Sequence, residues 1–231
     1  MIRAVLLDID NTLLDFDVYV EESLKKGFEK FGLGVFDEER LATFHRENHK
    51  VWRELEQGLL TYEDILKIRF NRIFAAMGVE FDGCVFEKYF KDSLFDHAVP
   101  IEGAMELLKH LQGRYIVCAA SNGPYEQQVN RLKVAGMLGY FDHIFVSEAV
   151  GASKPAAAFF DHCMRIVNDG REDPVQNAEV MMIGDSLTSD MAGAVGSGIH
   201  TCYFDKKKSR KAHELILEHE VTELKEILRI L

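Results

Sequence analysis

The apolar positions of this chain form two kinds of pattern, and each kind occupies its own part of the sequence. Near the start, residues 5–7 are all apolar and the run stops at Asp8, as in a buried strand. From residue 99 onward, short apolar runs alternate with stretches of helical periodicity. The expected strands cover residues 115–120, 144–146, 180–183 and 199–204, with helices beginning at Pro124, Pro155 and about Ser189. This alternation predicts βαβ units and a parallel sheet to which the first strand also belongs.

Residues 14–96 carry helical patterns only. Asp37 and the two acids after it mark the start of one helix, at the positive end of its dipole. Thr61 and Asp64 resemble a capping pair at the start of the next helix, and Gly78 is placed to end it. The sequence therefore predicts an all-helical block between the first strand and the rest of the sheet.

The predicted fold is thus α/β, with a Rossmann-like parallel-sheet core and an inserted all-helical cap. We assign the core to residues 1–13 and 97–231 and the cap to residues 14–96. Sheets of this kind bind their ligands at the carboxyl ends of the strands. Because the insertion leaves the core directly after the polar turn that follows the first strand, we expect it to cover that edge as a lid.

Composition and charge narrow the class of protein. The 231 residues are 47% hydrophobic, and 38 acidic against 27 basic side chains give a net charge of −11. That charge repels a nucleic acid polymer, whereas a small phosphorylated metabolite can still bind beside a local cation. The four cysteines have no metal-ligand spacing. The first apolar stretch is too short for a signal peptide and no segment is long enough to span a membrane, so we expect a cytoplasmic protein.

Polar residues gather where the predicted strands end. Six of them follow a strand or precede the next helix: Asp8, Asp10, Ser121, Lys154, Asp185 and Asp190. Taken singly, such residues have ordinary structural explanations, since Ser121 could cap a helix and Lys154 could be a solvated loop lysine. Taken together, they predict a cluster of acids and one cation at the carboxyl edge of the sheet.

In this order, the residues resemble the four motifs of the haloacid dehalogenase superfamily of phosphohydrolases. The matching segments are Asp8-Ile9-Asp10-Asn11-Thr12, Ser121-Asn122-Gly123, Lys154-Pro155, and Gly184-Asp185 through Asp190. The resemblance covers nearly the whole chain. A helical insertion after the first motif is similar to the C1-type cap of subfamily I. The resemblance implies a phosphoric monoester hydrolase that acts through an aspartyl phosphate.

The resemblance also implies a role for each matching residue. Asp8 is the expected nucleophile and Asp10 the expected general acid and base. Ser121, Asn122 and Lys154 are expected to bind the phosphoryl group, Ser121 and Lys154 also acting in catalysis. Two supporting residues complete the set, Thr12 and Asp190.

Charge counting indicates a metal among these residues. Four carboxylates, one lysine and a phosphate would repel one another strongly in a water-poor site, and Mg²⁺ suits such hard oxygen ligands. By resemblance, its ligands are the carboxylates of Asp8 and Asp185 and the backbone carbonyl of Asp10. We therefore expect Mg²⁺ as the cofactor.

Several functions stay open within this class. Asp10 favours phosphate esters over carbon–halogen bonds, because an alkoxide leaving group needs a proton. Residues 13–17, 147–155, and Trp52 with 57–58 are similar to the branch that contains pyrimidine nucleoside monophosphate 5′-nucleotidases. The alternatives are a sugar-phosphate or phosphoglycolate-type phosphatase, a phosphomutase, and a non-catalytic binding or regulatory protein of the same fold. Asn11 argues weakly against the phosphomutase.

Overall fold

The computed structural model describes residues 1–209 and 213–231, and its chain divides into two compact units. The core unit consists of Met1–Phe16 and Ala98–Leu231, and the helical unit is Asp17–His97. All four cysteines are free thiols. None of the helices in the described ranges combines the length and the apolar character needed to cross a bilayer.

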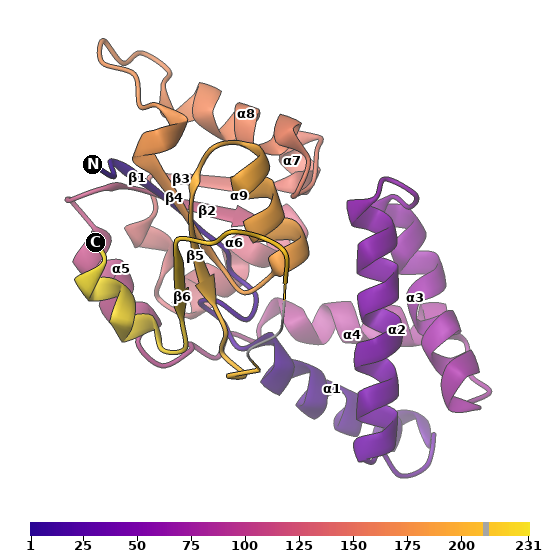
Figure 1. The fold of residues 1–231 in the computed structure, drawn as a ribbon. Coiled ribbons are helices and arrows are strands. Elements are labelled where there is room, and N and C mark those ends of the chain that lie inside the picture. The colour runs from indigo at the N-terminus through magenta and orange to yellow at the C-terminus, as the bar shows by residue number, and fades with distance from the viewer. Residues whose placement is uncertain (210–212) are drawn as a thin grey trace. The chain divides into compact units, whose positions relative to one another are not determined.

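The core unit is built on one six-stranded sheet in which all neighbouring strands are parallel. The strand order is β3-β2-β1-β4-β5-β6, so β1 lies between β2 and β4; Figure 1 labels these strands. The strands are β1 Ala4–Leu7, β2 Ile116–Ser121, β3 His143–Val146, β4 Val180–Gly184, β5 His200–Phe204 and β6 His219–Val221. The α/β fold with a parallel sheet, predicted from the sequence, is confirmed, and β6 is an addition to the predicted strands.

The register of the central strands brings their carboxyl ends level. Leu7 of β1 pairs with Ala119 of β2 on one side and with Ile183 of β4 on the other. Directly beyond this row, the backbone N–H of Asp8 donates a 2.9 Å hydrogen bond to the carbonyl of Ile183. Residues that follow these strands by one or two positions are therefore brought together.

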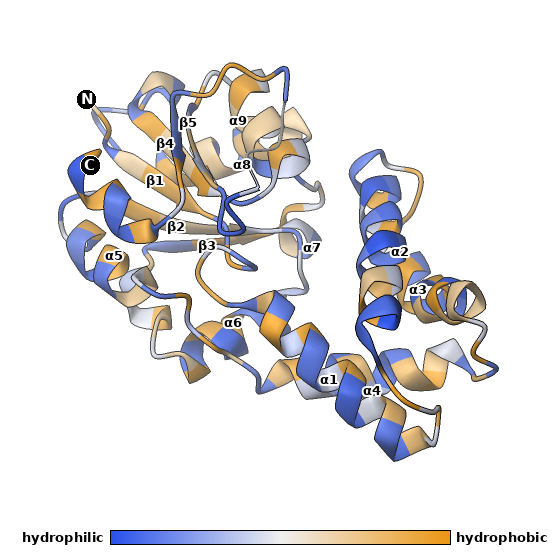
Figure 2. Ribbon diagram, turned by 60° about the horizontal axis from the view of Figure 1, so that its bottom comes forward, coloured by the Kyte–Doolittle hydropathy of each residue, from blue (hydrophilic) through white to orange (hydrophobic). Residues whose placement is uncertain are grey.

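Helices cover both faces of the sheet because the central strands are apolar on both sides (Figure 2). Val5 and Leu7 of β1 belong to one apolar cluster, whereas Ala4 and Leu6 belong to the other. The helices of the core unit are α5 Ala104–Leu111, α6 Tyr125–Val134, α7 Ser147–Val150, α8 Ala157–Val167 and α9 Ala192–Gly196. Shorter helical turns are Leu138–Tyr140, Asn177–Glu179, Leu187–Met191 and Leu224–Arg229.

Three helix starts differ from the sequence-based expectation. Pro124 precedes α6 by one residue, and Pro155 lies in a turn two residues before α8. The α-helix expected from about Ser189 begins only at Ala192, after a π-helical turn over residues 187–191. The Ser186 hydroxyl caps that turn by accepting from Ser189 N.

The helical unit contains four helices among the described residues: α1 Phe16–Phe31, α2 Glu38–Glu56, α3 Tyr62–Met77 and α4 Gly83–Phe95. The first residue of α1, Phe16, still belongs to the core unit. The predicted capping features are confirmed: Asp37 caps α2, Thr61 and Asp64 form a capping box, and Gly78 ends α3 in the left-handed conformation. Its core is rich in phenylalanine, with buried rings at Phe28, Phe44, Phe70, Phe74, Phe86 and Phe90.

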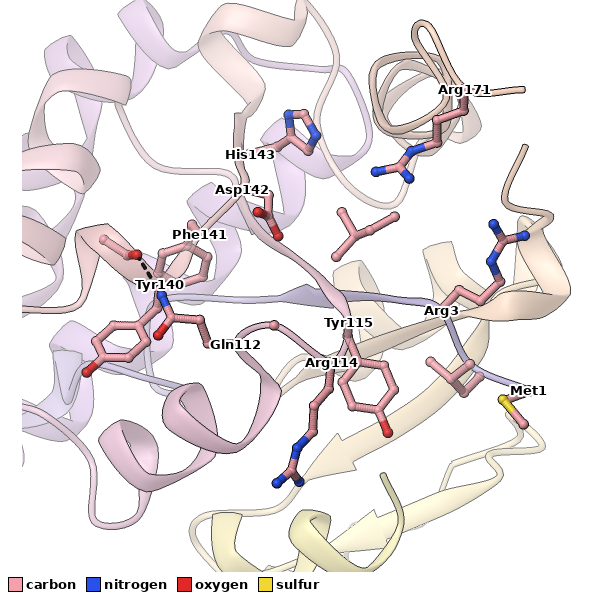
Figure 3. A pocket seen from close by; sticks show the side chains of 14 residues that line it. Met1, Arg3, Gln112, Arg114, Tyr115, Tyr140, Phe141, Asp142, His143 and Arg171 are labelled. Atoms are coloured by element: carbon pink, nitrogen blue, oxygen red, sulfur yellow. Dashed lines mark hydrogen bonds between the residues drawn. The ribbon is translucent and has the colours of Figure 1, made fainter. Parts of the chain in front are cut away.

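A hollow of about 700 Å³ opens at the opposite, amino-terminal edge of the sheet (Figure 3). Its lining includes Arg3, Tyr115 and Asp142, which precede β1, β2 and β3, together with Arg171. None of the predicted site residues lines it. The predicted chemistry lies instead at the carboxyl ends of the strands.

Candidate active site

A tight turn after β1 sets the direction of the first acids. The carbonyl of Ile9 accepts hydrogen bonds from the backbone N–H groups of Leu13 and Leu14, at 2.9 Å each. Asn11 has a φ of 61°, in the left-handed region that asparagine tolerates better than most residues. Glycine also adopts this conformation readily, so the backbone accommodates either residue at position 11.

Lys154 links the first and fourth motifs. Its Nζ atom donates to Oδ1 of Asp8 at 2.8 Å, to Oδ1 of Asp190 at 2.6 Å and to the carbonyl of Ala120 at 2.6 Å. The lysine side chain is only 2% exposed, so these three acceptors replace its hydration. Thr12 donates from its hydroxyl to the other oxygen of Asp8, at 3.2 Å.

Burial and neighbouring acids control the protonation of this group. The pKa of Asp8 is raised to about 7, chiefly by desolvation; Lys154 lowers it, and the nearby carboxylates of Asp190 and Asp10 raise it further. Burial alone lowers the pKa of Lys154, but Asp190 and Asp8 outweigh it and hold that pKa above its ordinary value. Lys154 is therefore a fixed positive charge, and Asp8 is the group whose charge depends on pH and on nearby cations.

Three carboxylates form a group that fits a divalent metal. Asp8, Asp185 and Asp190 each offer an oxygen atom, and these atoms lie within 4.8 Å of one another. Asp185 follows the end of β4 directly and is partly exposed, whereas Asp8 and Asp190 are buried. Carboxylate oxygens from a few residues, with room for water and phosphate, are what Mg²⁺ prefers. The residues present therefore fit the predicted cofactor.

The second motif supports the site in two ways. Asn122 accepts from Lys154 N and donates to Lys154 O with its side chain, both at 2.9 Å, and so it anchors the loop that carries the lysine. The Ser121 hydroxyl accepts from Gly123 N at 3.1 Å and from Gln128 Nε2 at 2.8 Å.

Two residues of α6 that the sequence analysis missed hold Asp10. Arg131 donates from Nη1 to Oδ1 of Asp10 at 2.5 Å, and Gln128 donates from Nε2 to Oδ2 at 2.6 Å. On an isolated helix, a glutamine and an arginine three residues apart look like a solvent-exposed pair. The available signal was their position in the helix that directly follows the second motif.

The structure thus brings together the predicted residues of the core unit. Asp8, Thr12, Lys154 and Asp190 are joined directly by hydrogen bonds, and Asp185 lies in the same carboxylate group. Ser121 connects to Asp10 through Gln128, and Asn122 connects to the backbone of Lys154. The site contains acids, a buried cation and hydroxyl groups at the end of a parallel sheet.

Comparison with known proteins assigns the family. The model of haloacid dehalogenase-like hydrolases matches residues 2–198, and the chain therefore belongs to this family. Bacillus subtilis YfnB, named as a HAD-hydrolase, is 30% identical over 99% of this chain and 95% of its own. Its magnesium-bound crystal structure superimposes with a TM-score of 0.88, covering 99% of this chain and 98% of that one at 28% identity.

Two further relatives are named as pyrimidine 5′-nucleotidases. PynA of Streptococcus pneumoniae is 31% identical over 88% of this chain and 84% of its own length. YjjG of Escherichia coli is 26% identical over 98% of this chain and 96% of its own. The family predicted from the four motifs is confirmed, and so is the enzyme class, phosphoric monoester hydrolase.

Proposed function

We propose that this enzyme hydrolyses pyrimidine nucleoside 5′-monophosphates, with Mg²⁺ as cofactor and an aspartyl phosphate on Asp8 as intermediate. The observation that carries the chemistry is the hydrogen-bonded pair of Asp8 and Lys154 at the carboxyl end of β1, with Asp185 and Asp190 beside it. The substrate class is supported by the two nucleotidase relatives, which match most of the chain.

In the first half-reaction, an oxygen of Asp8 attacks phosphorus, and the bond from phosphorus to the leaving oxygen breaks. Asp10 supplies the proton that this oxygen takes up. Lys154 stabilises the charge on the transferring group, and Ser121 can donate its hydroxyl proton to a phosphoryl oxygen because its own oxygen already accepts two hydrogen bonds.

In the second half-reaction, a water molecule attacks the same phosphorus atom and gives its proton to Asp10. The bond between phosphorus and Asp8 breaks, which restores the carboxylate and releases phosphate. The carboxylates of Asp8 and Asp185 and the backbone carbonyl of Asp10 would hold Mg²⁺, which would supply positive charge to offset the repulsion between the carboxylates and the phosphate.

The helical unit is assigned the role of a cap. Water must be controlled while the aspartyl phosphate exists, and helical insertions that close over a site serve this purpose. The relative YfnB supports this role, since its magnesium-bound structure is described as revealing interdomain movement.

The test is phosphate release from a panel of monoesters with Mg²⁺ present. The panel contains the pyrimidine and purine 5′-monophosphates, several sugar phosphates and phosphoglycolate. We expect the highest kcat/KM for pyrimidine nucleotides. A preference for a sugar phosphate or phosphoglycolate would refute the nucleotide assignment, and absence of hydrolysis for every monoester would refute the proposal as a whole.

A further inference from the structure

The Asp10 carboxylate is held on both of its oxygens by residues outside the four motifs. Oδ1 accepts from Arg131 at 2.5 Å, and Oδ2 accepts from Gln128 at 2.6 Å. Two bonds from different directions restrict rotation of the carboxylate about its own axis and fix where each oxygen points. The backbone of Asp10 is thus held by the turn after β1, and its side chain is held by two residues of α6.

The two residues form one buried unit. Arg131 and Gln128 are each only 1% exposed, although both belong to residue types that usually reach solvent. Arg131 Nη1 also donates to Gln128 Oε1 at 2.9 Å, and Gln128 Nε2 also donates to Ser121 Oγ. Each of these bonds satisfies a group whose burial would otherwise cost free energy.

The position of the Gln128 side-chain amide depends on the absence of a side chain at Gly123. A Cβ atom at this position would overlap Gln128 Nε2, so a larger residue would displace the amide. The glycine of the second motif therefore provides the space in which Gln128 reaches both Ser121 and Asp10.

From this geometry we infer that Arg131 and Gln128 are positioning residues that hold Asp10 in the orientation for proton transfer, an inference that rests on the proposed function. Arg131 donates to Asp10 directly, and it also donates to Gln128, which itself holds the other oxygen of Asp10. Proton transfer requires the donor and acceptor atoms to lie within hydrogen-bond reach, and small misplacements cost large factors in rate. Loss of Arg131 is therefore expected to lower kcat and to leave KM nearly unchanged.

The first experiment compares Arg131→Met with Lys133→Met. Both changes remove one positive charge from α6, but Lys133 is exposed. We expect kcat for a nucleotide to fall about 10- to 100-fold in Arg131→Met, with KM within about 2-fold of wild type. Lys133→Met should match wild type, and Arg131→Lys should recover part of the loss. Equal kcat in the two methionine variants would overturn the inference.

The second experiment separates positioning from a general structural role. p-Nitrophenolate leaves without a proton, so p-nitrophenyl phosphate needs less help from Asp10 in the first half-reaction. Phosphoenzyme formation in a single turnover should therefore be slowed much less by Arg131→Met with this substrate than with a nucleotide. When Asp10 is already replaced by asparagine, adding Arg131→Met should not slow phosphoenzyme formation any further. Equal losses for both substrates, or losses that add to that of Asp10→Asn, would show a structural role only.

A third variant covers the case in which Arg131→Met does not fold. Gly123→Ala leaves every charge in place and displaces the Gln128 amide, so it should show the same dependence on the leaving group. If wild type hydrolyses nucleotides but the variants show neither the loss of kcat nor its dependence on the leaving group, the positioning role is refuted and the proposed function stays intact. Failure of wild type on every monoester would refute both.

Discussion

Lys154 donates a 2.8 Å hydrogen bond to Asp8, although 146 positions separate the two residues in the chain. The same ammonium group bonds to Asp190 at 2.6 Å, so one cation lies between two buried carboxylates. With Asp185 included, three ionised carboxylates and one ammonium would leave a net charge of about −2, which one divalent cation balances. Stability, metal binding and catalysis at this site therefore depend on the same few charges.

Removal of Lys154 should destabilise the metal-free protein. In Lys154→Met, Asp8 and Asp190 would face each other in a buried site without their cation. Breaking a buried ion pair in this way typically costs about 3–5 kcal/mol. Urea unfolding in the presence of a chelator measures the loss. Lys109→Met, at an exposed position of α5, should change the free energy of unfolding by less than about 0.5 kcal/mol.

Replacement of Asp8 by asparagine should abolish turnover and yet stabilise the metal-free protein at alkaline pH. The pKa of Asp8 is raised from 3.8 to about 7, so the folded state binds this proton more tightly than the unfolded state does. The stability that this proton contributes is fully present below pH 3.8 and is lost as the pH rises through about 7. The asparagine side chain cannot ionise, so the Asp8→Asn variant avoids the cost of a buried charge above that pH.

The measurement is urea unfolding of both proteins from pH 5 to pH 8 with a chelator. The stability advantage of Asp8→Asn should shrink as the pH falls, by up to about 1.4 kcal/mol per pH unit between the two pKa values. Asp161→Asn, at an exposed position of α8, serves as the matched control and should follow wild type. The raised pKa of Asp8 is refuted if all three proteins show the same pH dependence.

Magnesium binding should compete with the proton on Asp8. Mg²⁺ needs the carboxylate, so its affinity should rise with pH up to about 7, where Asp8 loses its proton, and then level off. A ligand that binds only the folded state also raises the melting temperature as its concentration increases. Thermal unfolding at several Mg²⁺ concentrations and pH values tests both effects.

Asp185 offers the sharpest control for this magnesium site. It belongs to the carboxylate group of the site, whereas none of the Lys154 hydrogen bonds described above ends on it. Asp185→Asn should therefore abolish most of the magnesium-dependent shift in melting temperature, measured for each protein against its own metal-free form. A full magnesium shift in this variant would exclude Asp185 as a ligand.

Much of the fold and the acidic cluster could be predicted because strand ends are visible in the sequence. The apolar run before Asp8 and the one before Asp185 each stop abruptly at a carboxylate. Parallel pairing then makes those ends adjacent, as the level register of Leu7 and Ile183 shows. Local pattern and topology were sufficient for this part of the site.

The residues that hold Asp10 could not be predicted in the same way. Arg131 is charged and lies in a helix, and such residues usually point to solvent, so its burial depends on a partner 121 positions away. The π-helical turn over residues 187–191 was missed for a similar reason. This turn contains Asp190, which accepts a hydrogen bond from Lys154. The two residues are 36 positions apart, so no local sequence pattern indicates the bond.

The helical unit contains a buried ion pair whose removal can be separated from the active site. Arg69 of α3 donates from Nε to Glu87 of α4 at 2.9 Å, and both side chains are less than 10% exposed. Arg69→Met alone should cost about 3–5 kcal/mol by leaving Glu87 unpaired. Adding Glu87→Leu should recover most of this loss, because the double variant buries no lone charge. Urea unfolding of the three proteins measures both effects, and equal stability of the single and double variants would contradict the account.

Gly184, at the end of β4, is required for the position of Asp190. A Cβ atom there would overlap the Asp190 carboxylate, which accepts from Lys154 and from Ser186 N. Gly184→Ala should therefore displace Asp190, leave Lys154 with one carboxylate fewer and lower kcat. Gly196→Ala is the matched control, because a Cβ at this position meets no atom within 4 Å. If kcat and the melting temperature of Gly184→Ala equal those of Gly196→Ala, Asp190 can move without loss, and its bond to Lys154 does not orient the lysine for catalysis.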